Sequence, residues 1–404
     1  HRDAGARAAA AAALGRIAWV GAVQGLVRTT KDQDLLVRAA AIEALGHFSG
    51  IEAVDCLLRL VSGSDAEAAF TALWALEECG SRDARIVEAA RAILESGKAL
   101  TLQMQAAHLL GARRDASAVK SLVRLLKNRE WRLRSAAIEA LAKIRHKDAI
   151  EPLIERLDAE EGRLASDVAR ALAAITGAGF GLDAKKWREW WKAHKDGFEP
   201  PANPPVAERG DGNTEVLYHD IPVVSKRIVF VLDVSSSMAE PMGIKNVPSG
   251  PEGGPAGNTR LDYCRWELKK TVRKLPSDVR FNIVTFGSDV HPWKPALTPA
   301  LPAARKEAEA FIDKQAPAGS TNLFDALQCA FLDRDADTFY VLSDGQPTEG
   351  GITNPRELLA WVRRMNASRS VVIHTISAGE LTAVTDNLLE KMAAENGGRS
   401  VVLK

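Results

Sequence analysis

The sequence predicts a multidomain protein: an all-α helical solenoid followed by an α/β domain with a doubly wound, mainly parallel sheet. A leucine-centred motif recurs six times in the first half, whereas short runs rich in valine and isoleucine alternate with amphipathic helical stretches in the second. The chain has 404 residues, of which 46% are hydrophobic, so two or three separate cores are expected.

The recurring motif sets the length of the repeat. It reads AALGRI in its first copy and EALGHF in its second, and successive motif leucines lie 31, 31, 34, 31 and 31 residues apart. Each unit carries two helical patterns with apolar residues at i, i+3, i+4 and i+7. These units resemble short HEAT-like repeats, and the resemblance covers residues 1–177. The motif leucines are Leu14, Leu45, Leu76, Leu110, Leu141 and Leu172.

A tryptophan-rich helix is expected after the last repeat, within residues 178–198. Trp187, Trp190 and Trp191 fall on one helical stripe, and Asp183 could cap the start of the helix. Aromatic residues with this spacing could stack on bases or bind a ligand. Closing the open end of the solenoid is the favoured interpretation, because a terminal repeat must cover its neighbour's apolar face.

The helical signal then stops, and the composition changes twice. Residues 199–219 contain paired prolines, glycines and polar residues, which predicts a semi-rigid linker. The second domain is expected to occupy residues 220–404.

Basic residues gather between positions 111 and 147. A solvated helix face explains them most simply, and a surface for an acidic protein or an RNA backbone is the alternative. With 53 basic and 52 acidic residues, the formal net charge of +1 gives no global attraction for nucleic acid or for an anionic membrane. The candidates for an acidic-partner surface are Arg113, Arg114, Lys120, Arg124, Arg132 and Arg134.

Cysteine spacing and the start of the chain bear on where the protein acts. Cys56, Cys79, Cys264 and Cys329 have no metal-finger spacing, so buried apolar positions are expected for them. No stretch approaches the roughly 20 apolar residues of a membrane span. The chain begins at His1 rather than Met, so we expect removed upstream residues and favour a periplasmic or secreted location over a cytoplasmic one.

The second half alternates strand and helix patterns, which predicts a parallel sheet covered on both faces. In such sheets, ligands bind beyond the carboxyl ends of the strands. The strand candidates are residues 227–232, 280–286, 338–343, 370–376 and 399–404.

Oxygen-bearing side chains stand at these ends. The first strand runs into Asp233, Ser235 and Ser237, the strand 338–343 runs into Asp344, and another loop brings Thr321 to the start of a helix. All five side chains offer oxygen, and none offers sulfur or imidazole. This donor set suits a hard divalent cation, Mg²⁺ or else Mn²⁺ or Ca²⁺, rather than zinc.

The order Asp-x-Ser-x-Ser, Thr, Asp resembles the metal-ion-dependent adhesion site (MIDAS) of von Willebrand factor A (vWA) domains, over about residues 220–404. The resemblance implies that Ser235, Ser237 and Thr321 bind the metal directly. It implies that Asp233 and Asp344 coordinate it directly or through water. It also implies that an Asp or Glu of a protein partner replaces a water on the metal.

Three features depart from that family. Ser236 stands where glycine is common. Residues 241–258 form a Gly/Pro-rich insertion that could be a lid, a partner-selecting loop or a disordered segment. No counterpart is evident for the C-terminal helix that couples metal binding to affinity changes in adhesion receptors, which puts that switch in doubt.

A non-catalytic interaction scaffold is the leading functional hypothesis, since the combination resembles bacterial proteins that contain both modules. The alternative is an RNA-binding protein, because Ro-type proteins share this architecture. An enzyme is not expected: a Mg²⁺-dependent phosphatase would carry an acid where Ser235 stands, and no GxSxG elbow serves a hydrolase. His374 lies inside a predicted strand and is interpreted as structural.

Overall fold

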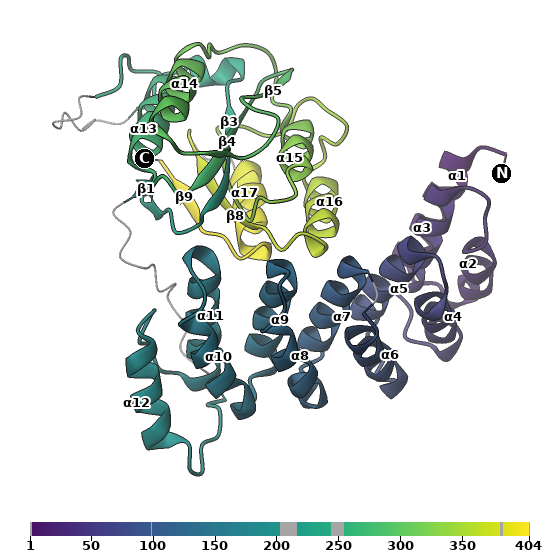
Figure 1. The fold of residues 1–404 in the computed structure, drawn as a ribbon. Helices are drawn as coiled ribbons and strands as arrows, with labels where there is room; N and C mark the ends of the chain where they lie inside the picture. The colour runs from purple at the N-terminus through teal and green to yellow at the C-terminus, as the bar shows by residue number, and fades with distance from the viewer. Residues whose placement is uncertain (1, 98, 203–215, 244–253, 380–382, 404) are drawn as a thin grey trace. The chain divides into compact units, whose positions relative to one another are not determined.

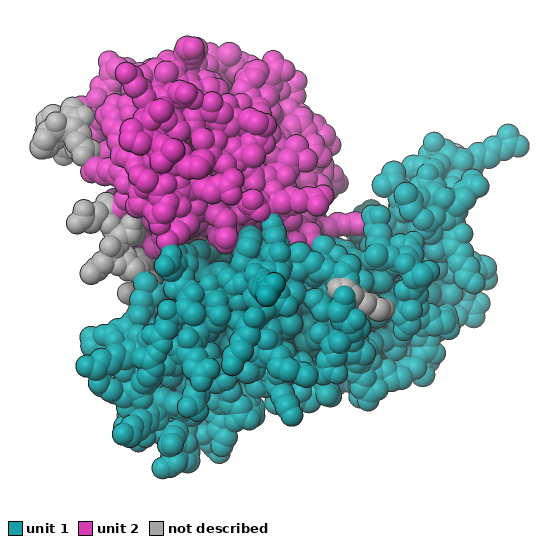
Figure 2. Space-filling view, viewed as in Figure 1, with its two compact units in different colours: residues 1–210 teal, residues 211–404 magenta. Residues whose placement is uncertain are grey.

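The structure is a computed structural model that describes residues 2–97, 99–202, 216–243, 254–379 and 383–403. The chain divides into two units, residues 1–210 and residues 211–404 (Figure 2). Most of the expected linker 199–219 and of the insertion 241–258 lies outside the described residues.

The first unit is a stack of helix pairs, which confirms the predicted solenoid (Figure 1). The first helices of the pairs pack on one another in sequence order and form one layer, and α2, α4, α6 and α8 form a second. The first helices are α1 (Ala4–Ile17), α3 (Leu35–Leu45), α5 (Ala66–Glu78), α7 (Leu100–Ala112), α9 (Trp131–Ile144) and α11 (Gly162–Thr176). Their partners are α2 (Val23–Thr29), α4 (Ile51–Ser62), α6 (Ala84–Glu95), α8 (Val119–Leu125), α10 (Ile150–Leu157) and α12 (Ala184–His194). Three of these partners follow a short 3₁₀ turn: η1 (Val20–Ala22) precedes α2, η2 (Ala116–Ala118) precedes α8, and η3 (Lys147–Ala149) precedes α10.

The motif residues explain how neighbouring repeats pack. In the first, second and fourth copies, the residue after the motif leucine is a glycine, which lies against the alanine that precedes the leucine of the next repeat. A side-chain carbon on Gly111 would lie 2.8 Å from Cα of Ala140, and one on Gly15 would lie 2.7 Å from Cα of Ala44. No side chain fits in that space, so the small residues let the two helix backbones approach closely.

The one irregular spacing coincides with a change in the same contact. Glu77 replaces the glycine in the third copy, and Leu109 replaces the facing alanine in the fourth. These larger side chains cannot occupy the close Gly–Ala contact, and this is where the leucine spacing lengthens from 31 to 34 residues.

The helix α12 packs against α10 and carries the tryptophan stripe. Trp187 is fully buried in the core of the first unit, and its indole N–H donates to the carbonyl oxygen of Gly181 at 2.9 Å. Trp190 stacks on the ring of His194, with 4.6 Å between the ring centroids. Trp187 therefore contributes to the solenoid core, as expected for a closing helix.

The second unit contains a seven-stranded sheet with a parallel centre, as predicted. Its main path has the order β5-β4-β3-β7-β8-β9, and β6 pairs with β4 beside β5. The parallel strands are β3 (Arg227–Asp233), β4 (Arg280–Phe286), β7 (Thr338–Ser343), β8 (Val372–Ser377) and β9 (Ser400–Val402). The short strands β5 (Val290–Pro292) and β6 (Thr298–Pro299) run antiparallel to β4 and have no counterpart in the sequence prediction.

Helices cover both faces of this sheet (Figure 1). Alternate residues of β3 enter two cores: Phe230 and Leu232 pack with residues of α13 and α14, and Val229 and Val231 pack with residues of α15 and α16. A central strand covered on both faces explains why its sequence is a continuous apolar run. These helices are α13 (Arg260–Lys274), α14 (Pro302–Asp313), α15 (Leu323–Leu332), α16 (Pro355–Ala367) and α17 (Ala383–Glu395), and η4 (Ser236–Ala239) follows β3.

A small hairpin precedes β3, where the sequence predicts the end of a linker. Its strands β1 (Leu217–Tyr218) and β2 (Ile221–Pro222) are antiparallel. Tyr218 is buried against Phe230, with 5.1 Å between ring centroids. This aromatic contact attaches the hairpin to the second unit, so that unit includes residues before 220.

The expectations drawn from composition can also be compared with the structure. Cys56, Cys79 and Cys264 are buried free thiols, and Cys329 is partly buried. Over the described parts of the chain, every helix is too short or too polar to cross a membrane.

The Gly–Ala contacts predict opposite effects for two glycine-to-alanine changes. Gly111→Ala is expected to destabilise the first unit by about 1–3 kcal/mol, because the added carbon overpacks against Ala140. Gly25→Ala in α2 is the matched control: nothing lies within 4 Å of the added carbon, so a gain of up to about 1 kcal/mol is expected. Urea unfolding followed by circular dichroism measures both, and equal stability of the two variants would contradict the packing role of the motif glycine.

Candidate metal centre

The loop that follows β3 is held by backbone hydrogen bonds to two other segments. The N–H of Val234 donates to the carbonyl of Phe286 at 2.8 Å, at the end of β4. The N–H of Ser236 donates to the carbonyl of Gly319 at 3.0 Å, and the N–H of Ala318 donates back to the carbonyl of Val234 at 2.8 Å. The Asp-x-Ser-x-Ser loop is therefore joined to the loop that carries Thr321.

Three of the predicted ligands form a chain of hydrogen bonds across the ends of β3 and β7. The hydroxyls of Ser235 and Ser237 lie 3.1 Å apart. The hydroxyl of Ser237 donates to Oδ1 of Asp344 at 2.7 Å, although the two residues are 107 positions apart in the sequence. The structure thus brings the side chains of Ser235, Ser237 and Asp344 together.

Asp233 is fully buried beneath this chain. Its Oδ1 accepts a hydrogen bond from the N–H of Ser235 at 2.8 Å, and its Oδ2 accepts one from the hydroxyl of Ser343 at 2.5 Å. Burial and, to a smaller extent, the charge of Asp344 raise the pKa of Asp233 to about 6, although the hydrogen bonds from Ser235 and Ser343 act to lower it. A cation beside these oxygens would stabilise the ionised carboxylate.

Thr321 lies at the same edge of the sheet. Its N–H donates to the hydroxyl of Thr348 at 3.0 Å, and its carbonyl accepts from the N–H of Thr348 at 3.0 Å. Its hydroxyl would lie 3.7 Å from a side-chain carbon built on Gly345, the residue after Asp344. The Thr321 hydroxyl therefore faces the segment that carries Asp344.

The chemistry of these donors fits a hard divalent cation. All of them are hydroxyl or carboxylate oxygens, the ligands that Mg²⁺ and Ca²⁺ prefer. Within the described ranges, no group of three or more His, Cys, Asp or Glu side chains is placed to hold a metal, so an ion here would depend on the serine and threonine hydroxyls. Ser236 begins η4 without a positive φ, so this position does not require glycine.

Two residues of this site, Ser343 and Arg260, are not among the residues predicted from the sequence. Ser343 immediately precedes Asp344, and its position as the last residue of β7 was the available signal. Arg260 donates from Nη1 to Oδ2 of Asp344 at 2.9 Å and pairs through Nη2 with Glu240 at 2.8 Å. Arg260 lies 84 positions from Asp344, and no local pattern in the sequence indicates that pair.

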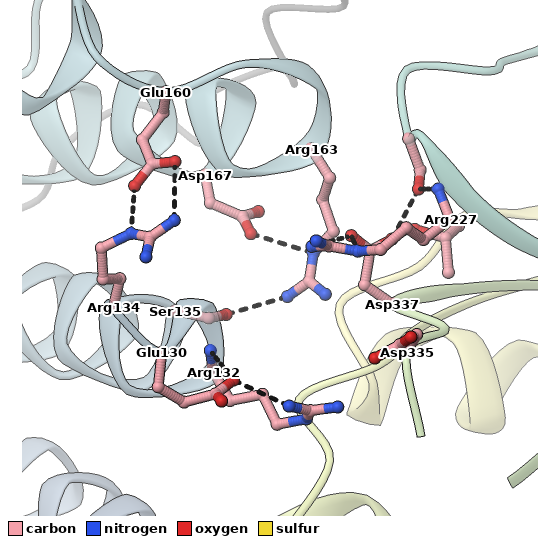
Figure 3. Close-up of polar contacts among 12 residues, drawn as sticks. Glu130, Arg132, Arg134, Ser135, Glu160, Arg163, Asp167, Arg227, Asp335 and Asp337 are labelled. Carbon is pink, nitrogen blue, oxygen red and sulfur yellow. Dashed lines mark hydrogen bonds and ion pairs between the residues drawn. The ribbon is translucent and has the colours of Figure 1, made fainter. Parts of the chain in front are cut away.

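The basic residues of the first unit do not form one uninterrupted free surface. Arg134 donates two guanidinium N–H groups to Glu160 (Figure 3) and another to the carbonyl of Asn128. Arg132 pairs with Glu130 at 2.7 Å, also in Figure 3.

Two more of the six candidates also act within the solenoid. Arg113 donates to the carbonyl of Leu76 at 2.7 Å, and Arg124 pairs with Glu95 at 3.0 Å. Arg114 and Lys120 are exposed. Three of the six predicted residues, Arg113, Arg124 and Arg134, therefore bond to other segments of the solenoid, and Arg132 pairs at the start of its own helix. These contacts weaken the case for a nucleic-acid surface.

Comparison with known families assigns both halves of the chain. Residues 1–77 and 87–173 match the model of HEAT repeats, and residues 260–402 match that of the von Willebrand factor type A domain.

Individual relatives match less than half of the chain. Inter-alpha-trypsin inhibitor heavy chain H3 of Mesocricetus auratus is 28% identical over 190 residues, which cover 44% of this chain and 19% of that protein. Human von Willebrand factor A domain-containing protein 3A is 31% identical over 177 residues, covering 44% of this chain and 13% of that protein. A von Willebrand factor type A structure from Catenulispora acidiphila has a TM-score of 0.34 at 17% identity, covering 45% of this chain and 39% of that one.

The matched region is thus less than a fifth of the length of these two relatives. The chain carries HEAT repeats in its first half and a von Willebrand factor type A domain in its second.

Proposed function

We propose that this chain is a non-catalytic interaction protein whose second unit binds an acidic group of a protein partner through a divalent cation. HEAT repeats and a von Willebrand factor type A domain together fit a protein-interaction role. The observation that carries the proposal is the chain of hydrogen bonds from Ser235 through Ser237 to Asp344, above the buried carboxylate of Asp233. Mg²⁺ is the proposed ion, with Mn²⁺ or Ca²⁺ as substitutes.

Each protein residue contributes a defined part. Ser235, Ser237 and Thr321 offer neutral oxygens, which leave most of a divalent charge uncompensated. Asp233 and Asp344 supply negative charge from fixed positions, because Ser343 and Arg260 hold their carboxylates by hydrogen bonds. When bound, the ion supplies an electrophilic point that attracts a carboxylate.

The HEAT repeats are proposed as a second binding surface. Each repeat contacts only its neighbours, so a solenoid leaves long faces available to other macromolecules. Large apolar side chains are exposed at the first repeats, among them Val20 at 78% and Leu36 at 72%. An apolar segment of a partner protein can pack on such side chains.

The proposed metal centre predicts different effects on Mg²⁺ binding when each of two adjacent serines is changed to alanine. Ser237→Ala is expected to weaken Mg²⁺ binding at least about tenfold, because it removes one ligand oxygen and the hydrogen bond to Asp344. Ser236→Ala is the matched control and should bind as the wild type does, since its exposed side chain lies outside the hydrogen-bonded chain. Isothermal titration calorimetry with Mg²⁺ and Mn²⁺ measures both, and Asp233→Ala should abolish the heat. Indistinguishable heats of metal binding for the wild type and Asp233→Ala would contradict the proposed metal centre.

Partner binding should depend on the same residues. A protein retained by the immobilised chain in Mg²⁺ is expected to dissociate in EDTA and to be lost from Ser237→Ala but not from Ser236→Ala. Changing the partner's contacting Asp or Glu to Asn or Gln should have the same effect as EDTA, because the neutral side chain cannot supply the charge. Surface plasmon resonance measures the binding of the partner. Binding that is unchanged both by EDTA and by the acid-to-amide change would contradict a metal-bridged contact.

A further inference from the structure

We propose that Arg260 is a resident counter-cation that weakens divalent-ion binding at the candidate centre, and that Glu240 offsets part of this effect. The inference rests on the proposed function, since it concerns the same oxygen donors. It assigns a role in tuning ion affinity to two residues that are not themselves among the proposed ligands.

The guanidinium of Arg260 lies directly on one of those ligands. Its Nη1 donates to Asp344 at 2.9 Å, and the same nitrogen lies 3.5 Å from the carbonyl oxygen of Ser237. The side chain of Asp344 is 0% exposed and that of Arg260 is 12% exposed, whereas that of Glu240 is 60% exposed. The positive charge of Arg260 therefore acts inside the site, and the negative charge of Glu240 acts largely from solvent.

Local preferences oppose a cation at this position. Arg260 is the first residue of α13, where Thr259 and Asp262 form a capping box. The positive end of a helix dipole disfavours an arginine there and favours an acid such as Asp262. The Nε atom of Arg260 is also buried without a hydrogen-bond partner among the described residues, which costs free energy. A residue kept against these costs is expected to serve the site.

The surrounding chain makes room for the guanidinium. A side-chain carbon on Gly379, just after β8, would lie 3.0 Å from Cζ of Arg260. The backbone of Arg260 is fixed as well, since its N–H donates to the carbonyl of Glu240 at 2.9 Å. Arg260 is thus held at Asp344 by side-chain and backbone contacts and by the absence of a competing side chain at position 379.

Electrostatics then sets the direction of the effect. Asp344 uses one carboxylate oxygen for Ser237 and the other for Arg260. A divalent ion bound by these ligands would share Asp344 with the guanidinium, and like charges repel strongly where solvent is excluded. Removal of the Arg260 charge should tighten ion binding about tenfold or more, and removal of the exposed Glu240 charge should weaken it about threefold.

The test compares two charge changes at the site with two matched changes away from it. Arg260→Met and Glu240→Gln are titrated with Mg²⁺ at pH 8 by calorimetry. Arg273→Met and Glu309→Gln remove the same charges from an exposed ion pair between α13 and α14, with 2.6 Å between Nη2 and Oε2. We expect a lower dissociation constant for Arg260→Met, a higher one for Glu240→Gln, and wild-type values for both controls.

Thermal unfolding provides a second readout. In EDTA, Arg260→Met should melt below the wild type, because Asp344 loses its counter-charge, and Mg²⁺ should raise its melting temperature more than that of the wild type. Glu240→Gln should keep its stability in EDTA, so its weaker ion binding cannot be ascribed to misfolding.

The outcomes separate the two proposals. If the wild type binds Mg²⁺ and Asp233→Ala does not, but Arg260→Met and Glu240→Gln bind with the wild-type constant, the role of Arg260 is overturned and the metal centre stands. If Arg260→Met binds more weakly than the wild type, Arg260 positions Asp344 rather than opposing the ion, and the inference is again overturned. Absence of binding by the wild type and by Arg260→Met overturns both proposals.

Discussion

The register of the parallel pairing between β3 and β7 is the constraint on which the candidate site depends. Val231 pairs with Val341 and Leu232 with Leu342, so the two strands end together and the hydroxyl of Ser343 meets Asp233. Both faces of β3 are buried in apolar cores, and a slip of one residue would exchange the side chains of those cores. The packing that fixes the register therefore also fixes the distance between the two acidic loops.

Much of the fold could be predicted because it follows from periodic patterns. The motif leucines and the apolar strand runs repeat with the geometry of the elements that they form. The reason for the glycine in the motif could not be read from one repeat, since it depends on Ala140 in the next one, 29 positions after Gly111. The strands β5 and β6 were missed because two or three residues are too few to show an alternating pattern.

In the candidate site, too, some residues could be predicted from local patterns and others depend on packing. Asp233, Ser235, Ser237 and Asp344 could be predicted because Asp233 ends β3, the other three follow the ends of β3 and β7, and parallel strands end at one edge. Arg260 could not, because its role depends on which residue the first turn of α13 meets. Arg134 shows a related limit: its charge is visible in the sequence, but its partner Glu160 lies 26 positions away. Local sequence shows which charges exist, and only packing shows which of them are already paired.

The balance of charge at the site links the proposed function to the role of Arg260. Asp233 and Asp344 bring two negative charges, and Arg260 brings one positive charge within hydrogen-bond distance of Asp344. Two positive charges from a divalent ion would leave the buried group with a net charge of +1, which is unfavourable away from water. One carboxylate from a partner would neutralise it. Because binding linkage is reciprocal, a centre with a resident arginine should hold its ion more tightly when an acidic partner is present, and should bind that partner more tightly when the ion is present.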